Sequence, residues 1–294
     1  ASGQRADRWL MLKGNQPSDG GNLCLSSNER QNLLSKSPQA SRFIMRYVGS
    51  QEIIRGEQRF CIWIEDGDKD KARLIPALKE RFDRVAEARS NSVAPSTRLY
   101  AAFPYKFRQI QDVGEKFTIA IPSVSSERRE FLPVDLYGAR TVVSNLAFAL
   151  YDAPIFNLAI IASRLHLVWI GTVCGKLKTD YRYSNTLGWN TFPLPTFSDQ
   201  NKADLGRCAE NILLARETHF PATIAQLYDP EKMPANLREA HEQNDETLER
   251  IYIGRRFKND TERLEKLFEL YTEMTAKQGD GQKPAKRKTK GTPK

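Results

Sequence analysis

The sequence has little of the chemistry on which metal sites and many enzymes depend. Its 294 residues include only three histidines and four cysteines. Cys24, Cys61, Cys174 and Cys208 lie far apart and show no Cys-x-x-Cys or Cys/His spacing of a metal site. We therefore expect buried, reduced thiols, which are typical of a cytoplasmic protein. The first residues show no secretion signal.

Long hydrophobic runs are also missing. The most apolar stretch, residues 153 to 174, is interrupted near its centre by Asn157, Arg164 and His166. Because charged and polar side chains are costly at the middle of a bilayer, this stretch predicts a buried helix and no membrane partner.

Positive charge is unevenly placed along the chain. The formal net charge is +9, yet the segment from Lys277 onward holds seven Lys or Arg against one Asp. Residues 41 to 198 hold 22 basic and 16 acidic side chains, whereas residues 199 to 276 hold 11 and 16. We therefore expect the middle of the chain to face a polyanion. The tail, residues 278 to 294, is poor in apolar residues and is predicted to be disordered.

Periodicity predicts a mixed first part. Strand-like runs at residues 43 to 48 and 59 to 64 flank a turn at Gly56. Further strands are expected between residues 98 and 150, with 141 to 150 as one strand. Helices are expected over about residues 71 to 89 and 154 to 173, the first with a buried stripe of Leu74, Leu78, Phe82 and Val85.

After residue 198 the pattern becomes wholly helical. Helices are predicted at residues 199 to 218, 221 to 227 and 234 to 253, and from Asp260 onward. The sequence thus predicts an α+β fold: a mixed-sheet domain with packed helices, followed by a small α-helical bundle.

The densest set of candidate contact residues lies between Val168 and Pro195. In an extended segment Lys178, Asp180 and Arg182 share one face, because side chains alternate along a strand. Lysine, arginine and aspartate also match base edges in a DNA major groove. A solvated charged loop is the alternative.

Two more segments carry polar side chains in suggestive places. Asn145 lies on a small, apolar face of the run 141 to 150, and asparagine can pair with adenine, although a structural amide is an equal alternative. Residues 123 to 129, with three serines and two arginines, follow a predicted strand. They suit phosphates and base edges equally, and a helix-capping turn is the alternative.

Several motifs in order resemble one known family. GKLKTDYRYS followed by WNTFPLP resembles the end of the target-recognition domain in MmeI-like (type IIL restriction-modification) enzymes, which combine adenine-N6 DNA methyltransferase and often nuclease activity. Upstream, DGGNLCLSSNER, RYVGSQEIIRG with RFCIWI, and IPSVSSERREFLP follow in that family's order. Downstream, ILLARE, LYDPEKMP and LREAH resemble its C-terminal helical part. The resemblance covers roughly Asp19 to Lys277.

The resemblance implies a sequence-specific double-stranded DNA recognition module of a site-specific adenine methyltransferase. The catalytic domain, with its S-adenosylmethionine, would lie outside this chain and would be a partner. The implied division is a connector over residues 1 to 40, a recognition domain over 41 to 198, a helical domain over 199 to 277, and the basic tail.

The resemblance also implies site residues on one shared surface. The implied base-reading residues are Ser123, Asn145, Leu146, Lys178, Asp180 and Arg182. The implied contacts to the DNA backbone are Ser125, Ser126, Arg128, Arg129, Lys176, Tyr181 and Tyr183. We expect Lys178 and Asp180 to read one G·C pair together, because guanine offers acceptors and cytosine offers an amino group.

Motifs of catalysis are missing. An adenine methyltransferase needs a glycine-rich loop for S-adenosylmethionine and a D/N-P-P-Y/F-like motif, and the nearest sequence, Phe103-Pro104-Tyr105, lacks the leading residue and the second proline. No nuclease constellation, P-loop or Ser/His/Asp set is evident, and no metal or cofactor is expected in this chain. Two alternatives remain: an enzyme of different chemistry with Asp180, Tyr181 and His166 as acid/base groups, or a stand-alone DNA-binding or protein-protein scaffold domain.

Overall fold

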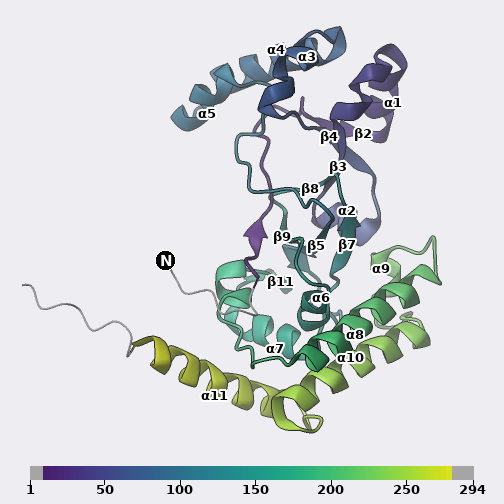
Figure 1. Ribbon diagram of the computed structural model, residues 1–294, viewed down its shortest axis with the longest axis vertical. Coiled ribbons are helices and arrows are strands. Elements are labelled where there is room, and N and C mark those ends of the chain that lie inside the picture. Colours follow the sequence, from purple (N-terminus) through teal and green to yellow (C-terminus); the bar gives the residue numbers. More distant parts are fainter. Residues whose placement is uncertain (1–8, 280–294) are drawn as a thin grey trace, which may run out of the picture.

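The computed structural model describes residues 9 to 279, with side chains described to residue 276 (Figure 1). Within this range the strands form three sheets, and most of the helices lie at the two ends of the molecule. The predicted α+β class is confirmed. The tail that we expect to be disordered, residues 278 to 294, lies outside the described range except for residues 278 and 279, which are the last two residues of helix α11.

The first sheet lies in the upper half of Figure 1. Its strands, in order, are β2 (Cys24–Ser26), β4 (Arg59–Ile62), β3 (Ile44–Val48) and β8 (Thr141–Val143). β3 and β4 pair antiparallel, which confirms the predicted pair of sheet strands. Helix α2 (Ser50–Arg55) connects them and ends at Gly56, whose φ of 68° is a conformation that glycine adopts without steric cost.

Helices cover this sheet and complete its core. They are α1 (Ser27–Lys36), the 3₁₀ turns η1 (Pro38–Phe43) and η2 (Asp66–Asp68), α3 (Lys69–Arg73) and α4 (Pro76–Ser90). Leu78, Phe82 and Val85 are buried as predicted.

Two expectations for this part are wrong. The single helix over residues 71 to 89 is two helices, because Pro76 lacks an N–H and begins a new helix after an extended Ile75. Leu74 therefore lies at the break and is 83% exposed. The residues from 98 onward, expected to be a strand, form the helical turns α5 (Pro95–Leu99) and η3 (Tyr100–Ala102).

The second sheet occupies the middle of the molecule and is antiparallel. Its strands, in order, are β1 (Leu12–Lys13), β9 (Ala147–Tyr151), β5 (Phe117–Pro122) and β7 (Asp135–Gly138). β1 and β2 both come from the segment that we expected to be a connector. The described part of that segment thus contributes strands to two sheets.

The run of residues 141 to 150 is not one strand. It divides into β8 and β9, which belong to different sheets, and residues 144 to 146 form the turn between them. Ser144 closes this turn: its carbonyl accepts from the Ala147 N–H at 2.9 Å, and its Oγ accepts from the Leu146 N–H at 3.2 Å. Asn145 therefore lies in a turn, and the strand face predicted for it does not exist.

The apolar stretch after residue 153 is likewise broken. It forms α6 (Phe156–Ile161) and α7 (Arg164–Val173), and the Ser163 side chain caps α7 by accepting from the His166 N–H. The buried location predicted for this stretch is confirmed, since every residue of α6 is buried. No helix among residues 9 to 279 has the length and apolar character needed to cross a membrane.

A small third sheet combines two strands that follow α7 with one that precedes it in the chain. It consists of β10 (Lys176–Leu177), β11 (Asp180–Arg182) and β6 (Val124–Ser125), and a single π-helical turn, η4 (Asn185–Trp189), comes directly after it.

The C-terminal part is helical, as predicted. Its helices are α8 (Asp199–Glu217), α9 (Ile224–Leu227), α10 (Ala235–Ile253) and α11 (Asp260–Gly279). α8 and α10 lie side by side, whereas α11 leaves them and crosses beneath α7 (Figure 1). The Phe268 and Tyr271 rings of α11 pack on Trp169 of α7, with centroids 5.4 and 5.6 Å from it. The helical part is thus joined to the mixed part by aromatic packing.

Candidate nucleic-acid interface

Ser123 lies where three segments of the chain meet. Its Oγ donates to the carbonyl of Leu146 at 2.6 Å, and Ser50 Oγ donates to the same carbonyl at 2.5 Å. On its other side, the Ser123 carbonyl accepts from the Tyr183 N–H at 2.9 Å. Ser123 therefore joins the 144–146 turn to the end of strand β11, although the sequence separates them widely.

The β10–β11 hairpin has two faces with different surroundings. Pairing sets Leu177 opposite Asp180, and Arg182 opposite Val124, on one face. This face is the outer one, because Leu177 and Arg182 are exposed and Asp180 is half-buried. Asp180 and Arg182 therefore share a face as predicted.

Lys178 does not share that face. It lies in the two-residue loop between Leu177 and Asp180, with a φ of 57°. The expectation that Lys178 continues an extended segment with Asp180 is wrong, because the chain reverses at this point. The turn nevertheless leaves the Lys178 side chain exposed and only two residues from Asp180.

The inner face of the third sheet, formed by the hairpin and β6, holds several residues predicted to touch the DNA backbone. Ser125 is buried and its Oγ accepts from Arg129 Nη1 at 3.2 Å. Tyr183 is 4% exposed, and its hydroxyl shares a hydrogen bond of 2.9 Å with His166 Nε2. The prediction is therefore corrected for Ser125 and Tyr183, because their side chains are part of the interior.

Tyr181 occupies an intermediate position on the same inner face. Its ring lies against Gly171 of α7, where an added Cβ would come within 3.2 Å of it. Lys176 Nζ lies 5.9 Å from the centroid of the ring. Tyr181 thus anchors the hairpin to α7 while remaining half-exposed.

The remaining cationic side chains differ in exposure and in their ion-pair partners. Lys176 is exposed and pairs with Glu127 at 3.4 Å, and exposed Arg128 pairs with Glu231 at 3.3 Å. Burial lowers the pKa of Arg129, and the nearby Asp180 carboxylate opposes that effect. Ser126 makes a local turn by accepting from the Arg128 N–H at 3.4 Å. The ion pairs of Lys176 and Arg128 are exposed, and such pairs contribute little to the stability of a protein in water. Both cations can therefore exchange their carboxylate partner for a phosphate.

The 144–146 turn presents its tip to solvent. Leu146 is 54% exposed and Asn145 is half-exposed, whereas Ser144 is buried. Helix α2 begins so close to the turn that a Cβ on Gly49 would lie 2.5 Å from Ser144 Oγ. Because only glycine permits this approach, the turn is fixed from behind while its tip stays accessible.

Asn15 is a positioning residue that sequence reasoning missed. It is fully buried, and its Nδ2 donates to the carbonyls of Val143 at 3.1 Å and Asp112 at 3.0 Å. Its main-chain carbonyl accepts from the Asn145 N–H at 2.9 Å. In the sequence Asn15 is part of a polar, turn-like stretch, and no local pattern indicates partners about a hundred residues away.

The structure does not assemble the acid/base set of the alternative enzyme hypothesis. His166 is fully buried, with the Phe192 ring 4.7 Å from its own, and its hydrogen bond to Tyr183 holds it in the core. Among the described residues no group of three or more His, Cys, Asp or Glu side chains is placed to hold a metal ion.

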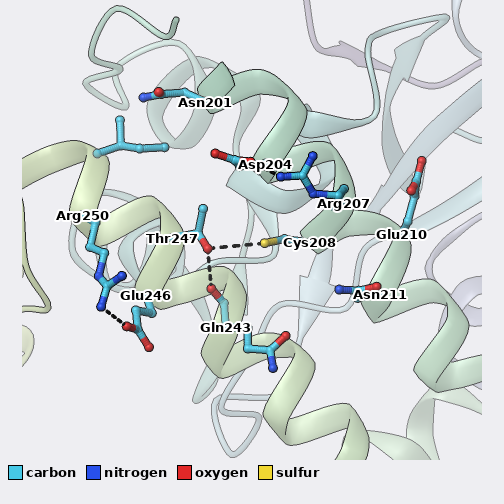
Figure 2. A pocket seen from close by; sticks show the side chains of 11 residues that line it. Asn201, Asp204, Arg207, Cys208, Glu210, Asn211, Gln243, Glu246, Thr247 and Arg250 are labelled. Atoms are coloured by element: carbon cyan, nitrogen blue, oxygen red, sulfur yellow. Dashed lines mark hydrogen bonds and ion pairs between the residues drawn. The ribbon is translucent and has the colours of Figure 1, made fainter. Parts of the chain in front are cut away.

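A concave feature lies between α8 and α10 (Figure 2). This open groove of about 860 Å³ is lined by polar side chains, and Cys208 contacts Thr247 across it at 3.5 Å. Two ion pairs form within the helices, Arg207 with Asp204 and Arg250 with Glu246, and Glu210 adds a further carboxylate to the lining. A groove with an excess of negative charge, in a part of net charge −5, is unfavourable for nucleic acid.

The chain thus consists of a mixed-sheet domain followed by helices α8 to α11. The domain carries the 144–146 turn, with Asn145, and the charged β10–β11 hairpin. Residues 2–196 match the family model described as "MmeI, target recognition domain", and residues 197–278 match "MmeI, C-terminal domain". The chain belongs to the MmeI family, which confirms the resemblance seen in the sequence.

Two relatives show how much of such a protein the chain represents. DNA methyltransferase A of Bacillus subtilis (strain 168) is 40% identical over 262 residues, covering 89% of this chain and 30% of the relative. The solved structure of the Type IIL restriction-modification enzyme MmeI in complex with DNA superposes with a TM-score of 0.86 at 30% identity, over 93% of this chain and 37% of that one. The chain thus spans about a third of the length of these relatives.

Proposed function

We propose that this chain is the part of a site-specific adenine-N6 DNA methyltransferase that reads a short sequence in double-stranded DNA. The observation that supports the proposal is the junction at Ser123, whose hydroxyl binds the Leu146 carbonyl and whose carbonyl binds the N–H of Tyr183, the residue after the Asp180–Arg182 strand. Amides, carboxylates and basic groups held together on fixed main chain are the groups that read base edges.

The similarity to MmeI supports this proposal, because that structure is a complex with DNA. In the proposal, Ser123, Asn145, Leu146, Lys178, Asp180 and Arg182 contact bases. The DNA backbone is contacted by the accessible members of the second set, which are Ser126, Arg128, Arg129, Lys176 and Tyr181. Phosphate contacts fix the register on the duplex, and base contacts supply the sequence preference.

The chemistry of methyl transfer is assigned to the rest of the longer polypeptide. S-adenosylmethionine would bind there, and the catalytic domain would be the protein partner of this chain. In this proposal residues 41 to 198 form the recognition domain. Residues 199 to 277 form a helical domain that supports it. A protein with this role works on cytoplasmic DNA.

The test is selection from a random duplex library by the 294-residue chain, followed by an assay with S-adenosylmethionine and the selected duplex. We expect enrichment of one short consensus and no methylation. Absence of any duplex binding at low salt would favour a protein-protein scaffold. Methylation by the chain alone would show that it is a complete enzyme.

A further inference from the structure

A second exposed segment runs beside the Asn145–Leu146 turn. Residues 108 to 111 form part of a long connection before β5, and their main chain is held at successive positions. The Arg108 N–H donates to the Pro17 carbonyl at 3.2 Å, and Gln109 exchanges two main-chain hydrogen bonds with Gln16, at 2.9 and 3.0 Å. The Gln111 N–H donates to Asn15 Oδ1 at 2.7 Å. A segment without regular structure is thus fixed like a strand.

The side chains of this segment are turned to solvent. Gln109 and Gln111 are exposed, and Ile110 between them is 46% exposed. Within the described residues, neither glutamine amide makes a hydrogen bond to another group. The protein therefore orders the main chain here while it leaves two amides and an apolar tip free for a ligand.

Asn15 places this segment next to the turn. Its side-chain oxygen binds the Gln111 N–H, and its main-chain oxygen binds the Asn145 N–H. One buried residue thus fixes the main chain at the exposed Gln111 and at the half-exposed Asn145. The two exposed apolar tips, Ile110 and Leu146, each lie next to one of these amides in the sequence.

We propose that Gln109 and Gln111 contact base edges of the same DNA site that the Asn145–Leu146 turn reads. Glutamine matches adenine bidentately at N6 and N7, and an apolar tip suits the methyl group of thymine. The segment 109 to 111 is thus a third specificity-determining part of the surface, beside the turn and the hairpin. This inference rests on the proposed function.

The experiment repeats the library selection with the chain carrying Gln109→Ala and Gln111→Ala. Because both side chains are exposed, the thermal midpoint should stay unchanged. Preference at one or two positions of the consensus should fall by about 5- to 150-fold, as expected when one bidentate pair is removed, while the other positions keep theirs. The matched control is Gln31→Ala with Gln243→Ala, which removes two exposed glutamines on α1 and α10. It should leave the consensus unchanged.

A second variant gives a change of preference instead of a loss. Gln111→Glu replaces an amide, which both donates and accepts, with a carboxylate, which only accepts. The base pair that Gln111 contacts should therefore change from one with adenine toward one with cytosine, whose N4 group donates. A consensus that stays the same in all variants, within about two-fold at each position, overturns the inference and leaves the proposed function standing. A uniform loss of affinity at every sequence also overturns it, since that result marks a backbone contact. If the unmodified chain enriches no consensus, the proposed function itself fails.

Discussion

The main-chain N–H of Asn145 donates to the main-chain carbonyl of Asn15, at 2.9 Å, in the interior behind the exposed turn. The Tyr47 hydroxyl donates to the same carbonyl at 3.3 Å. The side chain of Asn15 is saturated at the same time by groups of two other segments. A buried amide with all of its hydrogen bonds made fixes the segments around it, because each broken bond would leave a polar group without a partner.

Asn15→Asp should make the 144–146 turn less rigid and reduce the base preference of the chain. The carboxylate loses the donor that reaches the Val143 and Asp112 carbonyls and adds a buried charge, so the free energy of unfolding should fall by roughly 1 to 3 kcal/mol or more. Base preference should weaken at the positions read by Asn145. The measurements are chemical denaturation and library selection.

The matched control for Asn15 is Asn244→Asp. Asn244 is also fully buried and donates to the Ala159 carbonyl at 2.9 Å, but it lies in α10. It should lower stability without changing preference. If both variants change the consensus equally, Asn15 has no special link to the recognition surface.

Exchange of charge in the hairpin should reverse the reading of one base pair. With Lys178→Glu and Asp180→Arg, donor and acceptor change places, so a preferred G·C pair should become C·G. Truncation of either residue should cost about 1 to 3 kcal/mol of discrimination at that position. The measurement is the relative affinity for the two orientations.

The control for the hairpin exchange is Arg255→Glu with Glu262→Arg. This ion pair, 2.5 Å apart in the helical part, joins the exposed Arg255 to the half-buried Glu262 and carries the same exchange of charge at a distance from the proposed DNA-binding surface. An unchanged orientation preference together with undiminished affinity in the hairpin variant would reject Lys178 and Asp180 as base readers.

Deletion of residues 278 to 294 should flatten the salt dependence of DNA binding. The deleted tail carries six Lys or Arg and one Asp. Each phosphate that a protein neutralises adds about 0.9 to the slope of log affinity against log salt concentration, so the slope should fall by that amount for each phosphate that the tail neutralises. The consensus should not change. If the shortened chain no longer enriches the consensus, the tail contributes to sequence recognition.

Acidification should stabilise the junction between α7 and α10 through Asp245. Burial raises the pKa of this carboxyl to about 7, although its Oδ1 accepts from the Arg164 N–H at 2.7 Å. The folded state therefore holds a proton that the unfolded state releases near pH 4. It follows that this group destabilises the fold progressively as pH rises from about 4 to about 7.

Asp245→Asn removes that titration. The stability of the variant should depend less on pH across this window than that of the unmodified chain, measured by denaturation at several pH values. Glu242→Gln, an exposed carboxyl on the same helix, is the control and should leave the profile unchanged. An unaltered profile in Asp245→Asn would show that Asp245 is ionised throughout the range.

The sequence by itself determined the class of the fold and the order of its parts. Apolar spacing was enough for α8 and α10, because a long amphipathic period is a local signal. The β3 and β4 strands were also evident from composition. We expected one helix across Pro76, although a break there could have been predicted, since proline restricts the residue before it whatever the tertiary context.

Tertiary structure alone decided how the candidate surface is built. The run 141 to 150 has the composition of one strand, and it turns at Ser144 because its two halves complete different sheets. The hairpin at Lys178 and the burial of Tyr183 likewise depend on partners in β6 and α7. Asn15 shows the reason most clearly: main-chain groups must find partners wherever the fold brings them, and no local pattern records partners that distant.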